Sequence, residues 1–155
     1  MATSVKPIPD GYTAITPYLT VRNAAAAIEF YQKVFGAKER LRMGAPGGLV
    51  GHAELTIGDA VLMLSDEFPD MDVLSPQAIG GSPVCIHLYV EDVDMVAERA
   101  IGAGCKVLRP VADQFYGDRG GRFLDPYGHQ WWISTHKEDV SEAEAQRRAK
   151  ELYGA

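Results

Sequence analysis

The chain has 155 residues, of which 46% are hydrophobic and 23% charged, as expected for one globular domain with a sizeable core. A formal net charge of −6 argues against the basic surface that nonspecific binding to nucleic acid or to an anionic membrane requires, so neither partner is expected. No apolar run reaches the length of a membrane span, and residues 1–10 lack the apolar core of a signal peptide, which predicts a cytoplasmic protein.

An internal repeat covers most of the chain. Residues 15–41 and 84–108 each begin with a short alternating strand, pass through a polar turn and continue as an apolar-periodic helix that stops before a glycine. The alignment of the two copies extends further and places Met63 on Trp132. The expected strands are 15–21, 38–43, 51–57, 60–65, 84–90, 105–111, 122–124 and 130–135; the expected helices are 24–35, 93–101 and 141–153; and the expected loops are 44–48, 66–83 and 113–121.

The pair of strands 51–57 and 60–65 has the clearest local signal in the sequence. A two-residue Gly58-Asp59 turn suits the geometry of tight hairpins, and it determines which residues face each other. Alternate side chains then lie on opposite faces of the sheet. The face toward the core is expected to carry Ala53, Leu55, Ile57, Ala60, Leu62 and Leu64, and the other face His52, Glu54, Met63 and Ser65.

These elements predict an α+β fold in which two tandem βαβββ modules form a curved mixed sheet around a cleft, followed by a C-terminal helix. The expected parts are a leader (1–11), a first module (12–66), a linker (67–83), a second module (84–137) and a helical appendage (138–155). Alternation along the strands assigns a polar and aromatic lining to the cleft. Its expected members are Thr16, Tyr18, His52, Glu54, Met63, Ser65, Cys85, His87, Tyr89, Trp132 and Ser134.

Several short motifs resemble the vicinal oxygen chelate superfamily, which includes glyoxalase I, bleomycin-resistance proteins and extradiol dioxygenases. The motifs are the helix end 30–36, the turn 89–94 and the Asp-Pro-Tyr-Gly-His sequence 125–129. The segments 51–54, 62–66 and 114–119 are similar to the PhnB-like branch of that superfamily. The resemblance covers residues 12–137 and implies the paired-module fold and a homodimer, but no particular activity.

The resemblance also implies where a metal would bind. Metal enzymes of the superfamily take one His or Glu from each of four strands, and the aligned positions here are Thr16, Met63, Cys85 and Trp132. An indole offers no lone pair and a thioether is a poor ligand for hard cations, so neither this metal site nor any other cofactor is expected. The alternative is a displaced divalent metal on His52, Glu54 and His87.

The leading functional hypothesis is a metal-independent small-molecule binding protein that resembles the bleomycin-resistance type. The expected ligand-binding residues are Tyr18, His52, Glu54, Met63, Cys85, His87, Tyr89, Tyr116, Arg119 and Trp132, with aromatic rings that could stack on a planar ligand. Arg119 beside Asp118 could clamp an anionic group. The alternative is a glyoxalase-like lyase or isomerase with a displaced metal, or with acid/base catalysis by His87 and Glu54.

Overall fold

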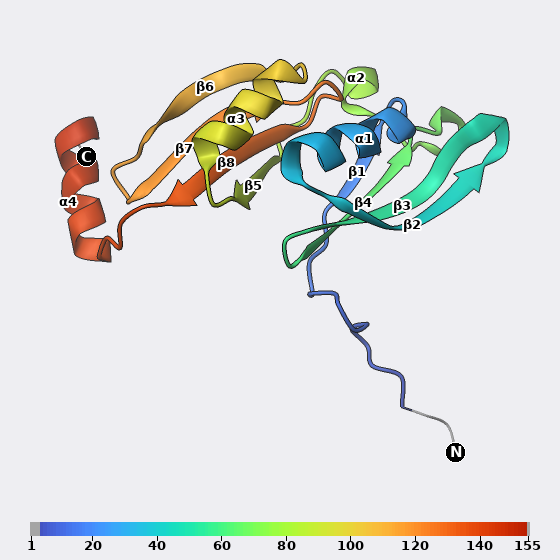
Figure 1. The fold of residues 1–155 in the computed structure, drawn as a ribbon, viewed down its shortest axis with the longest axis horizontal. Coiled ribbons are helices and arrows are strands. Elements are labelled where there is room, and N and C mark those ends of the chain that lie inside the picture. The colour runs from blue at the N-terminus through green and yellow to red at the C-terminus, as the bar shows by residue number, and fades with distance from the viewer. Residues whose placement is uncertain (1–3, 155) are drawn as a thin grey trace. The chain divides into compact units, whose positions relative to one another are not determined.

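The computed structural model describes residues 4–154 and divides the chain into two compact units at the Gly81–Ser82 bond. Each unit is one βαβββ module, and the second ends in an additional helix (Figure 1). The predicted α+β fold of two tandem modules with a C-terminal helix is therefore confirmed.

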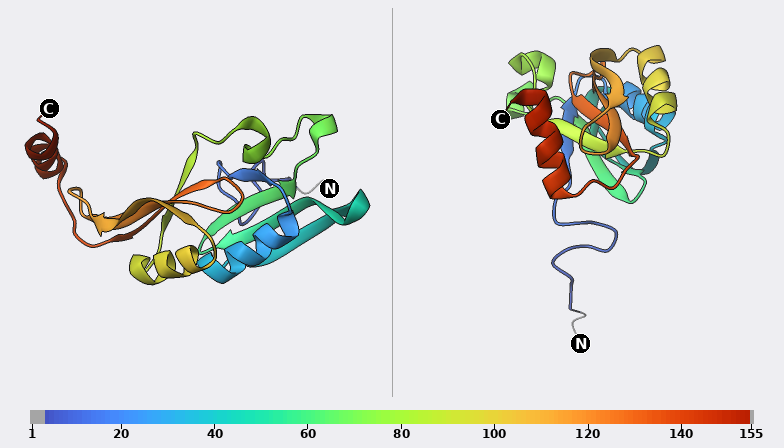
Figure 2. Two further views of the ribbon diagram at one scale, coloured as in Figure 1. Left: turned by 90° about the horizontal axis from the view of Figure 1, so that it is seen from above. Right: turned by 90° about the vertical axis from the view of Figure 1, so that its left-hand side faces the viewer.

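The first module is a four-stranded mixed sheet covered by one helix on one face (Figure 2). The strands lie in the order β1-β4-β3-β2, with β1 parallel to β4 and the other neighbours antiparallel. The elements are β1 (Tyr18–Val21), α1 (Ala24–Phe35), β2 (Lys38–Ala45), the short 3-10 turn η1 (Pro46–Gly48), β3 (Leu49–Ile57) and β4 (Ala60–Asp66). β1 begins later than the alternating pattern because Pro17 has no N–H to donate to a neighbouring strand.

The predicted register of the β3–β4 hairpin is confirmed. Leu55 faces Leu62, and Glu54 faces Met63. Of the residues expected on the core face, Ala53, Leu55 and Leu64 are fully buried and Leu62 nearly so, beneath a helix whose apolar side is equally buried. Glu54 and Met63 consequently lie on the open face, the one away from α1.

The segment between the modules was expected to be an aperiodic linker, but it is structured. It contains the 3-10 turn η2 (Pro69–Met71) and the short helix α2 (Pro76–Ile79), and Phe68 pairs with Val73 in an isolated bridge. The carboxylate of Glu67, at the start of this segment, accepts hydrogen bonds from the backbone and the hydroxyl of Ser75, near its end. It also accepts from the Arg22 guanidinium, which follows β1. The sequence shows no periodicity here because these bonds are local turns and long-range contacts rather than repeated ladders.

The second module repeats the plan with the order β5-β8-β7-β6, and β5 lies parallel to β8. Its elements are β5 (Cys85–Tyr89), α3 (Val93–Gly102), β6 (Lys106–Asp113), β7 (Asp118–Leu124) and β8 (Gln130–His136). The expectation of a loop over 113–121 was wrong, because β7 begins at Asp118 and its glycines lie inside the sheet. A Cβ on Gly120 would approach the backbone oxygen of Ile133 to 2.8 Å, so glycine here reflects close packing of strands rather than a loop.

The alignment of the two modules is confirmed by strand pairing. Tyr18 faces Met63 in the first sheet, and His87 faces Trp132 in the second. The closing hairpin of the second module has a longer turn, so the residue that faces Trp132 is Arg122, at the place that Glu54 occupies in the first module. At corresponding positions of the repeat, the first module therefore has the acidic residue Glu54 and the second has the positively charged residue Arg122.

The last helix, α4 (Glu142–Tyr153), begins as predicted, with the Ser141 hydroxyl accepting from the Glu144 backbone N–H at 3.2 Å. Arg148 joins this helix to the second module, because its guanidinium donates to Glu138 and to the carbonyl of Phe115. Among residues 4–154, no helix has both the length and the apolar character needed to cross a membrane.

Candidate functional site

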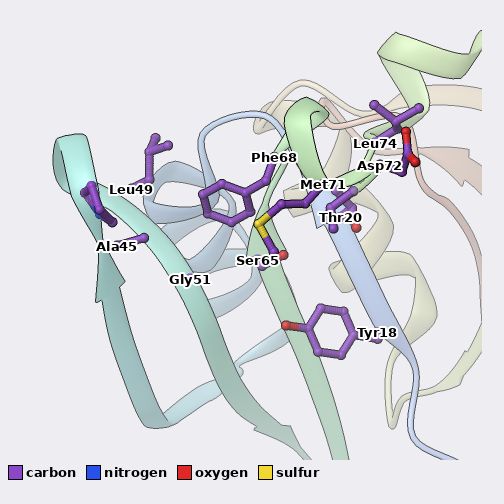
Figure 3. Close-up of a pocket in the computed structure, with 12 residues that line it drawn as sticks. Tyr18, Thr20, Ala45, Leu49, Gly51, Ser65, Phe68, Met71, Asp72 and Leu74 are labelled. Atoms are coloured by element: carbon purple, nitrogen blue, oxygen red, sulfur yellow. The ribbon is translucent and has the colours of Figure 1, made fainter.

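A cavity with a volume of about 920 Å³ lies over the open face of the first sheet (Figure 3). Its floor comes from the strands and its wall from the connecting segment between the modules. The floor and rim residues are Tyr18, Thr20, Ala45, Pro46, Leu49, Gly51 and Ser65, and the wall residues are Phe68, Met71, Asp72, Val73 and Leu74. The connecting segment thus covers part of the sheet face opposite the helix.

A β-bulge in β3 shapes this floor. Met43 pairs with His52 and Gly44 pairs with Val50, so Gly51 is an extra residue without a partner. The bulge shifts the alternation of the strand: Val50 is turned into the core, and both Gly51 and His52 lie on the open face. Glycine at the bulge leaves the cavity floor free of a side chain.

A chain of hydrogen bonds crosses the same open face. The Tyr12 hydroxyl donates to Oε2 of Glu54, and His52 Nε2 lies 3.1 Å from Oε1 of the same carboxylate. The Tyr18 hydroxyl lies 2.8 Å from the other ring nitrogen of His52, Nδ1. His52 therefore connects a nearly buried carboxylate to a tyrosine that lines the cavity.

The surroundings of Glu54 stabilise its ionised form. Its hydrogen bonds from Tyr12 and then from His52 lower the pKa of its carboxyl group, with a smaller contribution from the Arg40 guanidinium, whose Nε is 3.7 Å away. The Arg40 guanidinium also lies over the Tyr12 ring, 4.8 Å from its centre. A carboxylate can only accept, so neutral His52 carries its proton on Nε2 and presents Nδ1 to Tyr18 as an acceptor.

Replacing Tyr12 with Phe should raise the pKa of Glu54 toward its ordinary value, because the largest cause of the lowering is removed. A lowered folded-state pKa contributes stability above the unfolded-state pKa, and this contribution is lost as pH falls through the folded-state pKa. The variant should therefore lose less stability than wild type on acidification. NMR titration of the Glu54 carboxyl carbon measures this, with Tyr153→Phe as a control at an exposed tyrosine; an unchanged Glu54 titration in Tyr12→Phe would contradict the assignment.

The open face of the second sheet carries the other predicted aromatic residues. His87 Nε2 lies 2.7 Å from the Ser134 hydroxyl, and its ring stacks on Tyr89 with centroids 4.7 Å apart. The Trp132 ring is 6.5 Å from the His87 ring, and its indole N–H is buried without a hydrogen-bond partner among the described residues. His87, Tyr89 and Trp132 therefore form an aromatic cluster on this face.

Asp118 and Arg119, which the sequence suggested as a clamp for an anionic group, both bond to other residues of the protein. The two side chains point to different partners: Asp118 accepts from Tyr89 and also bonds to His136. The guanidinium of Arg119 is occupied by two other carboxylates, with bonds of 2.9 Å to Asp94 and 3.3 Å to Asp113. Arg119 thus fastens β7 to α3 and to the end of β6.

The remaining predicted residues lie in separate places. Met63 lines a smaller cavity of about 480 Å³ with Thr16 and residues of the leader. Tyr116 packs edge-on against Phe115, next to the C-terminal helix. Cys85 is a half-buried free thiol, while burial raises the pKa of the other free thiol, Cys105, to about 12. Within residues 4–154, no three His, Cys, Asp or Glu side chains gather as metal ligands would.

The hydrogen bonds of Glu54 and of His87 described above are to residues of their own modules. A direct contact between His87 and Glu54, as acid/base catalysis by the pair would use, stays a prediction.

Sequence reasoning missed several residues of the site. Thr20 could have been found, since it follows Thr16 and Tyr18 at the same two-residue spacing. The wall residues and Tyr12 gave no local signal, because they reach the sheet from segments without periodicity.

Comparison with known proteins agrees with this architecture. The model of the Glyoxalase/Bleomycin resistance protein/Dioxygenase superfamily matches residues 11–133. The uncharacterised protein Mb0911c of Mycobacterium bovis is 41% identical over 149 residues, which is 94% of each chain. Protein PA1353 of Pseudomonas aeruginosa has a TM-score of 0.65 at 25% identity and covers 81% of this chain and 99% of its own. The PhnB protein of Bacillus cereus shares the fold, with a TM-score of 0.62 at 19% identity over 79% of this chain and 99% of its own. On the strength of the family match and the paired βαβββ modules, this chain belongs to the Glyoxalase/Bleomycin resistance protein/Dioxygenase superfamily.

Proposed function

We propose that the protein binds a small, largely apolar molecule in the cavity of its first module, without the divalent metal of the superfamily's enzymes. The observation that carries the proposal is the cavity itself. Its volume of about 920 Å³ is in the range of small-molecule sites, and a few polar groups such as Tyr18 and Ser65 interrupt an otherwise apolar lining. Sites of this composition bury most of a ligand and orient it with few hydrogen bonds.

The donor set supports a metal-free protein. The positions that correspond to the family's ligands include Met63 and Trp132, and an indole has no lone pair for a cation. The alternative set would use His52 and Glu54, but these two side chains bond to each other and to two tyrosines. A cation at this place would have to disrupt that network.

The same network bears on the enzymatic alternative. A general base works best with a pKa near the working pH, and the pKa of Glu54 is shifted away from neutrality. This weakens the case for Glu54 as a base and favours a structural role. We place the protein in the PhnB-like branch as a further part of the proposal, supported by the motifs in β3, β4 and residues 114–119.

Filling the cavity should weaken binding of an apolar probe. Leu49 lies at the rim with 41% of its surface exposed, so Leu49→Trp can place an indole in the cavity without overpacking the core. We expect the affinity for N-phenyl-1-naphthylamine, followed by its fluorescence, to fall at least about tenfold, since the lost burial is worth more than about 1.4 kcal/mol.

The matched control is Leu108→Trp, because Leu108 has nearly the same exposed fraction, 42%, and does not line the cavity. It should bind the probe as wild type does. If both variants bind like wild type, the probe occupies another surface and the proposal loses its support.

We also propose a homodimer. In the first sheet β2 is an edge strand with exposed apolar side chains, among them Leu41 and Met43, and β6 is the corresponding edge of the second sheet. Unpaired edges of this kind are protected in most proteins, frequently by another subunit. Light scattering should give twice the mass of the chain at micromolar concentration; the mass of a single chain would contradict this.

A further inference from the structure

We infer that the cavity of the first module selects ligands that donate hydrogen bonds, cationic amines above all, and discriminates against anions. The inference rests on the proposed function, because it assigns the ligand's polar group to the same cavity. It follows from the directions in which the polar groups of the lining point.

The first of these groups is the Tyr18 hydroxyl. The ionised Glu54 accepts from His52 Nε2, and in the imidazole tautomer that makes this bond Nδ1 carries only a lone pair. The Tyr18 hydroxyl, 2.8 Å from Nδ1, must therefore donate its proton to the ring. What the Tyr18 oxygen can still offer a ligand is a lone pair.

The Ser65 hydroxyl is oriented in the same way. Ser65 is 3% exposed, and its Oγ donates to the backbone carbonyl of Asp66 at 2.9 Å. Its proton is directed into the protein, and its oxygen lone pairs are left for the cavity. Two hydroxyls that could each have served as donor or acceptor are both fixed as acceptors by protein contacts.

Charge acts in the same direction. Asp72 at the wall adds a carboxylate, labelled beside Leu74 in Figure 3. None of the described residues that line this cavity is Lys, Arg or His. An anionic ligand would thus lose its hydration beside the Asp72 carboxylate and two oriented acceptors, whereas an ammonium or amide N–H finds acceptors there.

The test compares ligands that share a tail and differ only in the polar group. Octylamine, octanol and octanoate would compete with N-phenyl-1-naphthylamine for wild-type protein at 0.15 M salt, where the net charge of the chain is screened beyond about 8 Å. We expect octylamine to displace the probe at a concentration at least tenfold lower than octanoate, with octanol between them.

Two conservative variants connect this selectivity to the proposed geometry. Tyr18→Phe removes an acceptor and should reduce the preference for octylamine over octanoate at least threefold. Tyr153→Phe makes the same change on an exposed tyrosine of α4, which does not line the cavity, and should leave the preference unchanged. Circular dichroism verifies that both variants fold.

The outcomes separate the two proposals. If Leu49→Trp weakens probe binding, the cavity binds ligands. If octanoate then competes as well as octylamine, or if Tyr18→Phe keeps the full preference for octylamine, the selectivity inference is wrong. If Leu49→Trp leaves probe binding intact, the proposed function itself fails.

Discussion

Replacing Asp66 with Ala should destabilise the protein by about 3–5 kcal/mol, because two buried backbone donors lose their acceptor. The Asp66 side chain is 4% exposed and lies at the end of β4. One carboxylate oxygen accepts from the Ala24 N–H at the start of α1 at 2.8 Å, and the other accepts from the Val50 N–H beside the bulge at 2.7 Å. A single side chain thus connects the helix, the hairpin and the cavity floor.

Urea unfolding followed by circular dichroism measures this loss. Asp70→Ala makes the same change at an exposed position in η2 and should remain within about 0.5 kcal/mol of wild type. Asp66→Asn keeps one accepting oxygen and places an amide N–H₂ against the other donor. Its loss of unfolding free energy should therefore be no larger than that of Asp66→Ala. A small effect of Asp66→Ala would mean that water replaces the carboxylate in the core.

Gly117→Ala should destabilise the second module by about 3–5 kcal/mol, since strain and a backbone clash act together. Gly117 has φ +101°, a conformation that alanine rarely adopts, and a Cβ there would lie 2.1 Å from the carbonyl oxygen of Glu138. The Gly117 carbonyl also accepts from the N–H groups of Lys137 and Glu138. The turn before β7 and the segment that leads to α4 can therefore pack only if residue 117 lacks a side chain.

The comparison for this prediction is Gly44→Ala. Gly44 lies in the edge strand β2, has no atom within 4 Å of an added Cβ and does not have a positive φ. Its variant should be neutral or slightly stabilising, because alanine restricts the unfolded chain more than glycine does. Equal unfolding free energies for the two variants would show that the Gly117 turn can shift without cost.

The sequence by itself determined the elements whose signals are local. The alternation of the β3–β4 hairpin and its Gly58-Asp59 turn predicted every pairing that the structure shows between Ala53 and Leu64, since register depends on turn length and on a two-residue period. Helix ends were predictable for a similar reason: α1 stops before Gly36, which takes the left-handed conformation at its C-terminus. The same periodicity placed His52 and Glu54 on the open face.

Tertiary structure decided what happens on that face. Tyr12 reaches Glu54 across 42 residues of sequence, and neither alternation nor turn chemistry contains information over such a separation. The packed glycines of β7 depend on the backbone of a neighbouring strand, so in the sequence they resemble a loop. The bulge at Gly51 also depends on the neighbouring strand, and the sequence gives no separate signal for it. The wall of the cavity, from Phe68 to Leu74, is positioned by contacts with the sheet rather than by its own pattern. Local patterns thus specify which way a side chain points, whereas the partner that it meets is specified only when distant segments pack together.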